Sequence, residues 1–289
     1  MSWKAYEVIF RLCSPMHIGL SKVGNLQQTR PYVVGRVFWG ALAMRLTRER
    51  YSPATDSAHY KKVGGKIHST MAFTYFYPAL STCHGYQVVW PWDKSNTFTY
   101  RFIRSYMSAA LSYPMQSAAE GKLHEMEFLS PCTLDTGEQV FMLGYVFIKD
   151  DCTLDWEAVL DKLQFGGERG YGWGDVRKKN SSLHVYPSLF DGSLEVVLDG
   201  EKPVVSIRRS NPLLAHCLAK DQKGVIQVEG TVEPLVGREW DSTKDKYHYA
   251  GQHIAFNNIC FAPGSIVTQD SRFTIGDYGI WYPFETSAS

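Results

Sequence analysis

The sequence predicts an α+β protein: a ferredoxin-like (RRM-like) βαββαβ domain with insertions, followed by a second, β-rich domain. Residues 3–13 alternate apolar and polar side chains, which is typical of a half-buried strand. Residues 35–50 repeat apolar side chains at helical spacing and end in arginines, which suit the end of a helix. After residue 187 the chain consists mainly of short strand-like runs, and these predict the second domain.

The predicted elements of the first domain, residues 1–187, follow the order strand, helix, strands, helix, strand. Apolar patterns place the elements, and Gly, Pro and polar runs mark the loops between them. The sequence predicts a strand over 3–13, a loop over 14–32, a helix over 35–50, a polar loop over 51–66, strands over 70–80 and 85–92, a helix over 97–113, a pair of strands over 123–131 and 139–149, a short helix over 154–165 and a strand over 173–187.

The second predicted domain covers residues 188–289. Its strand-like runs are "SLEVVLD", "VVSIRR", "GVIQVEG" and "IAFNNICFAPGSIV". These runs are short and separated by turn residues, so we expect a β-rich unit, which could also be a degenerate ferredoxin-like domain.

Composition and charge exclude several functional classes. The chain has 289 residues and a net charge of +1, so it is not a globally basic nucleic-acid binder, and any anion site needs local clustering. No segment approaches the length of a transmembrane helix, and the charged N-terminal segment is no signal peptide, so we expect no membrane contact. The six cysteines are scattered singly and form no CxxC motif, which fits a cytoplasmic protein without a zinc site.

The stretch "FGGERGYGWGDV", residues 165–176, concentrates glycines at Gly166, Gly167, Gly170, Gly172 and Gly174. Glycine permits positive φ and close backbone approach, and successive exposed N–H groups can bind phosphate. The Arg169 guanidinium can grip a phosphate oxygen, and Tyr171 and Trp173 can stack on bases. The alternative is a flexible turn with both aromatics in the core. Because the loop precedes a strand rather than opening a helix, it is unlike nucleotide-cofactor motifs, and we expect no cofactor.

"LQFGGERGYGWGDV" resembles the glycine-rich loop of the RAMP superfamily, the subunits of CRISPR effector complexes. Two more stretches, in the same order along the chain, resemble that superfamily's other motifs. They are "SPMHIGLSKVGNLQQTRPYVVGRVFWGALAMRL" (14–46) and "GKLHEMEFLSP" (121–131).

In the Cas seven and Cas six groups such a loop lies near the C-terminus, whereas here a long segment containing "FAPGSIV" follows it. The chain therefore looks most like the Cas five group of type III systems, and the type III-D version is the narrower expectation. The resemblance implies a non-catalytic subunit that binds CRISPR RNA (crRNA) and caps the complex at the crRNA 5′ handle. It also implies a Cas ten type large subunit and a Cas seven type backbone subunit as partners.

The remaining candidates for RNA contact precede the first helix or lie in its first turn. Lys22, Arg30 and Arg36 are candidate phosphate contacts, with a solvated surface as the alternative. His17 is either a turn residue near the RNA or, in a Cas six type endoribonuclease, the general base. Residues 14–35 contain no Asp or Glu, which argues against the target-cleaving aspartate of some Cas seven type backbone subunits. An interaction protein without RNA contact also fits, its aromatics serving as interface anchors.

Overall fold

The computed structural model describes residues 2–112, 117–219, 227–242 and 253–284, and it confirms a mixed α+β architecture. Its first sheet has the strand order β12-β1-β11-β5-β6, and every adjacent pair is antiparallel. A short strand, β4, also pairs with β11. The strands are β1 (Trp3–Leu12), β4 (Met71–Phe73), β5 (Tyr77–Thr82), β6 (Gly85–Val88), β11 (Phe141–Lys149) and β12 (Val176–His184).

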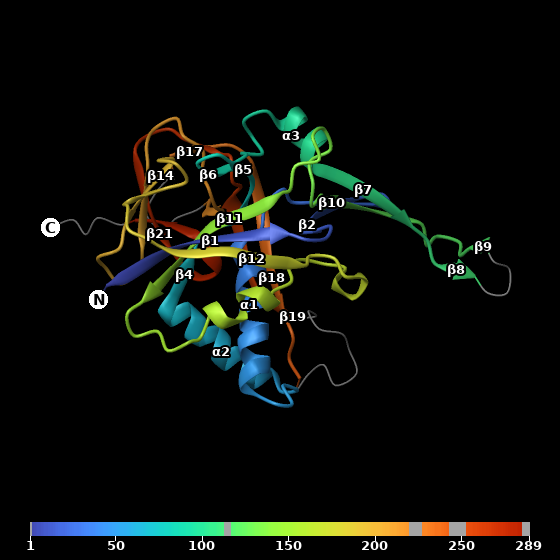
Figure 1. Cartoon of the computed structure of the whole chain (residues 1–289), viewed down its shortest axis with the longest axis horizontal. Coiled ribbons are helices and arrows are strands. Elements are labelled where there is room, and N and C mark those ends of the chain that lie inside the picture. The colour runs from blue at the N-terminus through green and yellow to red at the C-terminus, as the bar shows by residue number, and fades with distance from the viewer. Residues whose placement is uncertain (1, 113–116, 220–226, 243–252, 285–289) are drawn as a thin grey trace.

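Helices cover one side of this sheet, as Figure 1 shows for α1 and α2. The central strand β11 is buried at every position except its last, because the protein covers both of its faces. Phe10, Phe38, Phe76 and Phe165 pack ring against ring between the strands, α1 and the glycine loop. The helical elements here are α1 (Gly35–Arg50), α2 (Ser57–Thr70) and the 3₁₀ turn η1 (Glu157–Lys162).

A second sheet, of order β2-β3-β10-β7, continues into an arm that projects from the body in Figure 1. The strands β8 and β9 lie near the end of this arm. The helix α3 (Ser95–Phe102) leads directly into β7. The strands are β2 (Gly19–Val23), β3 (Leu26–Thr29), β7 (Ile103–Ser108), β8 (Leu111–Ser112), β9 (Ser117–Ala118) and β10 (His124–Leu129).

In the described residues after position 187 strands are the main elements, as predicted, and eight of them form a sheet of order β13-β14-β15-β21-β22-β16-β19-β18. Two 3₁₀ turns, η2 (Arg169–Tyr171) in the glycine loop and η3 (Asp277–Gly279), complete the described elements. The strands are β13 (Ser188–Leu189), β14 (Leu194–Val197), β15 (Val204–Ile207), β16 (Cys217–Leu218), β17 (Val228–Glu229), β18 (Val232–Glu239), β19 (His253–Phe261), β20 (Ile266–Val267), β21 (Ser271–Ile275) and β22 (Trp281–Pro283).

Buried polar contacts join this C-terminal part to the first sheet and its loops. The Tyr77 hydroxyl donates to the Leu214 carbonyl oxygen at 2.7 Å, and the Tyr75 hydroxyl and His216 Nδ1 are hydrogen-bonded at 2.7 Å. The described part of the chain contains no helix long and apolar enough to span a membrane. The division into domains at residue 187 stays a prediction.

Several predicted elements were wrong. The predicted loop over 14–32 contains the β2–β3 hairpin, and the predicted helix over 97–113 ends at Phe102, where β7 begins. The short helix over 154–165 is only the 3₁₀ turn η1. The strands β10 and β11 were predicted as a pair, yet they lie in different sheets and only Cys132 and Gln139 beyond them form a bridge.

The predicted loop over 51–66 contains most of α2. Asp56 caps this helix by accepting a hydrogen bond from the Ala58 N–H at 2.8 Å. Gly64, inside the helix, suggested a loop, but the Trp39 ring fills the place where its Cβ would be. Tertiary packing, not local flexibility, therefore explains this glycine.

Candidate nucleic-acid interface

The three stretches that carry the family resemblance meet in space. Met16 and Leu129 exchange backbone hydrogen bonds of 3.1 and 2.8 Å, which joins the first stretch to β10. The glycine loop closes onto the same first stretch, where the Gly174 N–H donates to the Pro15 carbonyl at 2.7 Å. The Gly167 N–H donates to the His17 carbonyl at 2.9 Å. Segments far apart in the sequence therefore build one local surface.

The glycines of the loop have different structural roles. Gly166 and Gly174 have φ of +82° and +77°, and a Cβ at either would strike a backbone carbonyl, that of His17 or of Phe165. Gly172 also has positive φ, at +81°, but faces open space. Gly170 combines an ordinary φ with open space, so nothing in the described part of the protein requires a glycine there. Gly170 is thus the position where an external group could need the close approach.

The protein itself uses much of the loop's backbone hydrogen-bonding capacity. The N–H groups of Gly167, Tyr171, Gly172, Trp173 and Gly174 all donate to carbonyl oxygens within the fold. Among the described residues, no acceptor meets the N–H groups of positions 168, 169 and 170. The expected phosphate cradle is therefore narrower than the whole glycine stretch. Beside these three N–H groups the Arg169 side chain is exposed, with the Met44 sulfur 3.8 Å from its Nη1.

The loop borders a cavity of about 390 Å³ that we call the aromatic groove. Its far wall is one face of the β7–β10 pair, where Tyr106 lies opposite Met126. Tyr171 is 84% exposed at the rim, whereas Trp173 packs its ring 5.1 Å from that of Phe128. The groove is lined by Pro15, Tyr106, Ser108, His124, Met126, Phe128, Glu168, Tyr171 and Trp173.

The sequence pointed to the two aromatics of the loop but did not place those of the arm beside them. Tyr106 was expected on a helix, and Phe128 was not singled out. Residues 103–108, Ile-Arg-Ser-Tyr-Met-Ser, do not alternate apolar and polar side chains, so they gave no clear local signal for the strand that carries Tyr106. That Phe128 meets Trp173 depends on tertiary structure and has no local signal.

The strand register brings Lys22 to the same face as the groove. Lys22 lies opposite Gln27, Gln27 opposite Met126, and Met126 opposite Tyr106. Residues paired across neighbouring strands share a face, so the four side chains form a row across the sheet. Arg104, opposite Phe128, lies on this face too. Two exposed cations thus accompany the aromatic side chains.

Arg30 and Arg36, expected at phosphates, are engaged inside the fold and do not line the groove. The Arg30 guanidinium, 7% exposed, donates from both Nη atoms to the Glu233 carboxylate at 2.8 Å. Arg36 lies 3.5 Å from the Glu239 carboxylate, and its guanidinium stacks over the Tyr278 ring at 4.7 Å. Both arginines connect the N-terminal segment to the C-terminal sheet.

Glu233 also contacts His216, whose Nε2 is 2.7 Å from one carboxylate oxygen. Burial alone would raise the pKa of the Glu233 carboxyl, but hydrogen bonds from His216 and Arg30 outweigh it and lower the pKa to about 2. Burial lowers the pKa of His216 below its ordinary value. The cluster therefore contains a carboxylate held ionised by its neighbours.

His17 is held by the fold on several sides. His17 is only 7% exposed, and its Nδ1 donates a hydrogen bond to the Glu127 carbonyl oxygen at 2.7 Å. Its ring also lies against Gly167, where a Cβ would come within 3.4 Å. His17 thus positions the glycine loop against β10.

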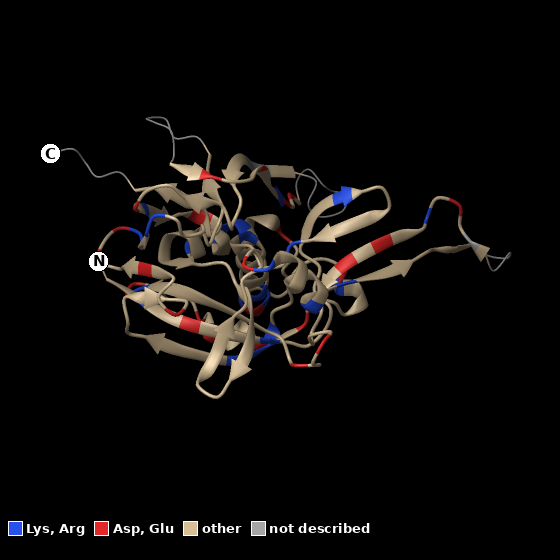
Figure 2. Cartoon of the chain, turned by 90° about the horizontal axis from the view of Figure 1, so that it is seen from above, with Lys and Arg blue, Asp and Glu red and all other residues tan. Residues whose placement is uncertain are grey.

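Charge is mixed across the molecule. Figure 2 shows Lys and Arg interspersed with Asp and Glu over the body, with both signs present on the arm. In the parts of the chain that the structure describes, no three His, Cys, Asp or Glu side chains are grouped to hold a metal ion.

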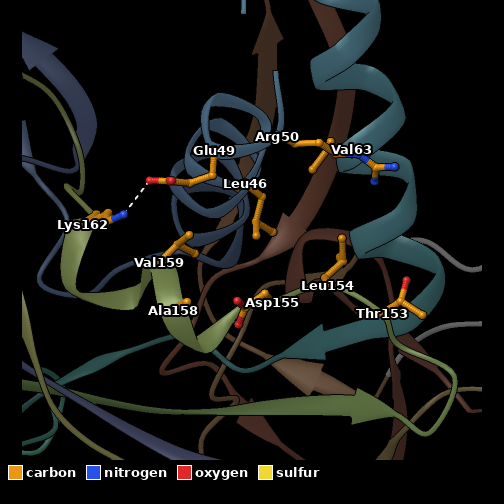
Figure 3. Close-up of a pocket in the computed structure, with 10 residues that line it drawn as sticks. All are labelled: Leu46, Glu49, Arg50, Val63, Thr153, Leu154, Asp155, Ala158, Val159 and Lys162. Atoms are coloured by element: carbon orange, nitrogen blue, oxygen red, sulfur yellow. Dashed lines mark hydrogen bonds and ion pairs between the residues drawn. The ribbon is translucent and has the colours of Figure 1, made fainter. Parts of the chain in front are cut away.

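A second cavity, of about 270 Å³, lies between α1, α2 and η1 (Figure 3). Leu46, Val63, Leu154 and Val159 supply its apolar lining. The Lys162 ammonium and the Glu49 carboxylate form an ion pair of 2.7 Å at its edge. No aromatic side chain lines it, so it offers no stacking surface for a base.

Comparison with known proteins finds distant structural likeness only. No family model and no curated protein matches the chain. The chain is similar to one in the cryo-EM structure of the Type III-B Cmr-beta bound to cognate target RNA and AMPPnP, with 14% identity, 90% of this chain and 85% of that chain covered, and a TM-score of 0.48. For the Type III-B Cmr-beta bound to cognate target RNA, the identity is 14%, the coverage is 90% and 86%, and the TM-score is 0.47. For the apo state of the Type III-B Cmr-beta, the identity is 9%, 61% of this chain and 96% of that chain are covered, and the TM-score is 0.37.

Proposed function

We propose that the chain is a non-catalytic crRNA-binding subunit of a type III CRISPR effector complex that caps the complex at the crRNA 5′ handle. The observation that supports this is convergence: the three RAMP-like stretches meet beside the aromatic groove, linked by the Met16–Leu129 and Pro15–Gly174 hydrogen bonds. Stretches spread over more than 150 residues thus contribute to one local surface, as motifs with a shared role would.

The groove has the features that single-stranded RNA recognition needs. Splayed bases stack on aromatic side chains, and Tyr106 and Tyr171 both present exposed rings. Arg169, Lys22 and the N–H groups of residues 168–170 supply donors for phosphate oxygens. Because few cations take part, we expect the binding to weaken moderately with salt and to depend strongly on stacking.

The order β12-β1-β11-β5, antiparallel throughout, supports a ferredoxin-like arrangement of the first sheet. Within a complex, we expect a Cas ten type large subunit and a Cas seven type backbone subunit as neighbours. The type III-D version stays a prediction. One copy per purified complex supports a cap, and several copies would instead indicate a Cas seven type backbone subunit.

The competing function is a Cas six type processing endoribonuclease with His17 as the general base. A base must reach the 2′-hydroxyl of the scissile nucleotide. His17 is nearly buried and donates to the Glu127 carbonyl, which favours a positioning role for it.

The test mixes the purified chain with labelled repeat-containing RNA, without added metal, and follows mobility shift and cleavage on one gel. We expect a shift that depends on the handle sequence, with intact RNA. Gly170→Val should weaken binding about tenfold, equivalent to about 1.4 kcal/mol, because a Cβ there blocks close approach of the RNA. The matched control is Gly65→Val, which also adds a side chain into open space but on α2.

Equal binding of handle and scrambled RNA would contradict the capping function. Equal binding by the wild type and Gly170→Val would show that the glycine loop is not part of the RNA-binding site. Cleavage within the repeat that disappears in His17→Ala would make the chain a processing nuclease.

A further inference from the structure

The aromatic groove contains an acidic side chain where an RNA-binding surface would be expected to be basic. Glu168 lines the groove and is half-buried, with its backbone in the left-handed region at φ 53°. A non-glycine residue rarely adopts this conformation unless the surrounding structure enforces it. Within the described part of the chain, its carboxylate has no hydrogen-bond or ion-pair partner. Glu168 is therefore an acidic residue of the groove lining whose carboxylate is not engaged by the described part of the protein.

His124 also lines the groove, and one of its ring nitrogens is engaged within the protein. His124 Nδ1 donates to the Lys122 carbonyl oxygen at 3.1 Å. In a neutral imidazole the second nitrogen, Nε2, then carries no proton and accepts hydrogen bonds. The Glu168 carboxylate, and His124 in its neutral form, therefore favour a ligand edge that is rich in donors.

A carboxylate repels the phosphates of a bound RNA, so its presence costs affinity unless a base donates to it. Such a group can instead give specificity, because it strengthens the binding of one base and weakens the binding of the others. The four bases differ in this respect. Guanine presents two adjacent donors on its Watson–Crick edge, N1–H and the N2 amino group, which match the two oxygens of a carboxylate. Adenine and cytosine offer a single amino group, and uracil sets its one N–H between two carbonyl oxygens.

We propose that the aromatic groove holds one splayed guanine, stacked between the aromatic side chains, with N1–H and N2–H donating to the Glu168 carboxylate. Glu168 is then the residue that determines base specificity. The inference rests on the proposed RNA-binding function and deepens it, since it names the base that this site takes. It does not depend on the source of the RNA.

The test uses fluorescein-labelled single-stranded RNA 8-mers of uridine that carry one central guanosine, inosine, adenosine, cytidine or uridine. Binding to the full chain is measured by fluorescence anisotropy. Inosine lacks only the N2 amino group, so it isolates one of the two proposed hydrogen bonds. We expect guanosine to bind about tenfold more tightly than uridine, in line with a good bidentate base contact, and inosine to lie between them.

In Glu168→Gln, one carboxylate oxygen becomes an amide NH2 group, which donates instead of accepting, and the preference for guanosine over uridine should fall below about twofold. The control is Glu201→Gln, an exposed substitution outside the groove that should keep the preference. Thermal unfolding of both variants shows whether either change disturbs the fold.

Three results would overturn the inference: equal binding of guanosine and uridine oligomers, an unchanged preference in Glu168→Gln, or no binding of any oligomer. The handle experiment fails independently of these. A mobility shift that depends on the handle, without a preference for guanosine, would contradict only the guanine inference. A preference for guanosine without dependence on the handle would contradict only the capping function.

Discussion

Gly170 and Gly174 stand four residues apart in the same loop, and the structure gives them different roles. Gly174 needs its positive φ and would place a Cβ against the Phe165 carbonyl, whereas Gly170 faces open space. Gly174→Ala should lower the free energy of unfolding by about 1–3 kcal/mol, the usual cost of a strained backbone position. Gly170→Ala should change it by less than about 0.5 kcal/mol.

Urea denaturation followed by circular dichroism measures both values. Equal destabilisation by the two substitutions would mean that Gly170 is structural too, and the interpretation of its RNA phenotype would fail. The sequence predicted that this stretch is a loop with special backbone needs. It could not separate the glycines, since the carbonyls that Gly166 and Gly174 approach belong to packing within the folded loop and its neighbours.

At the scale of an element, adjacent residues of β7 present their side chains on opposite faces of the strand. Tyr106 and Met107 are each 60% exposed, but only Tyr106 lines the aromatic groove. Tyr106→Ala should weaken RNA binding by about 1–3 kcal/mol, the cost of losing one base stack. Met107→Ala, on the opposite face, should leave binding unchanged. Anisotropy titrations with the handle RNA measure both, and equal losses would mean that the groove is not where the RNA lies.

The same strand shows why sequence patterns located only part of the site. Phe98 and Phe102 are spaced for a helix and are both buried in α3, so the predicted helix was correct up to Phe102. The strand that begins at Ile103 was not predicted, because residues 103–108 do not alternate apolar and polar side chains. The β2–β3 hairpin is local, and the two residues that join its strands, Gly24 and Asn25, are a typical hairpin turn that could have predicted it. The pairing of β3 with β10, about a hundred residues later, has no comparable signal. Local pattern cannot reveal such distant pairing.

At the scale of the whole molecule, the Arg30–Glu233 pair joins the N-terminal segment to the C-terminal sheet. Arg30→Met leaves the Glu233 carboxylate without its bidentate partner and should cost about 3 kcal/mol of stability at pH 7. Glu233 has a lowered pKa, so its contribution is complete above the ordinary pKa of a glutamate and is lost as the pH falls towards about 2.

The wild type should therefore lose more stability than Arg30→Met between about pH 4.5 and pH 2, and the difference between them should narrow on acidification. Thermal melts across this pH range measure the difference. A gap that stays constant would show that the charge of Glu233 is not what Arg30 stabilises. The sequence offered no route to this pair, because Arg30 was plausible at a phosphate and Glu233 had no motif.

The same pair has a consequence for how the protein is made. Its two residues are 203 positions apart in the sequence. At a synthesis rate of about 5–20 residues per second, Arg30 leaves the ribosome roughly 10–40 seconds before Glu233 does. During that interval the Arg30 guanidinium has no carboxylate partner, and the N-terminal segment is not yet joined to the C-terminal sheet. The contact that joins the N-terminal segment to the C-terminal sheet can therefore form only after most of the chain has been synthesised.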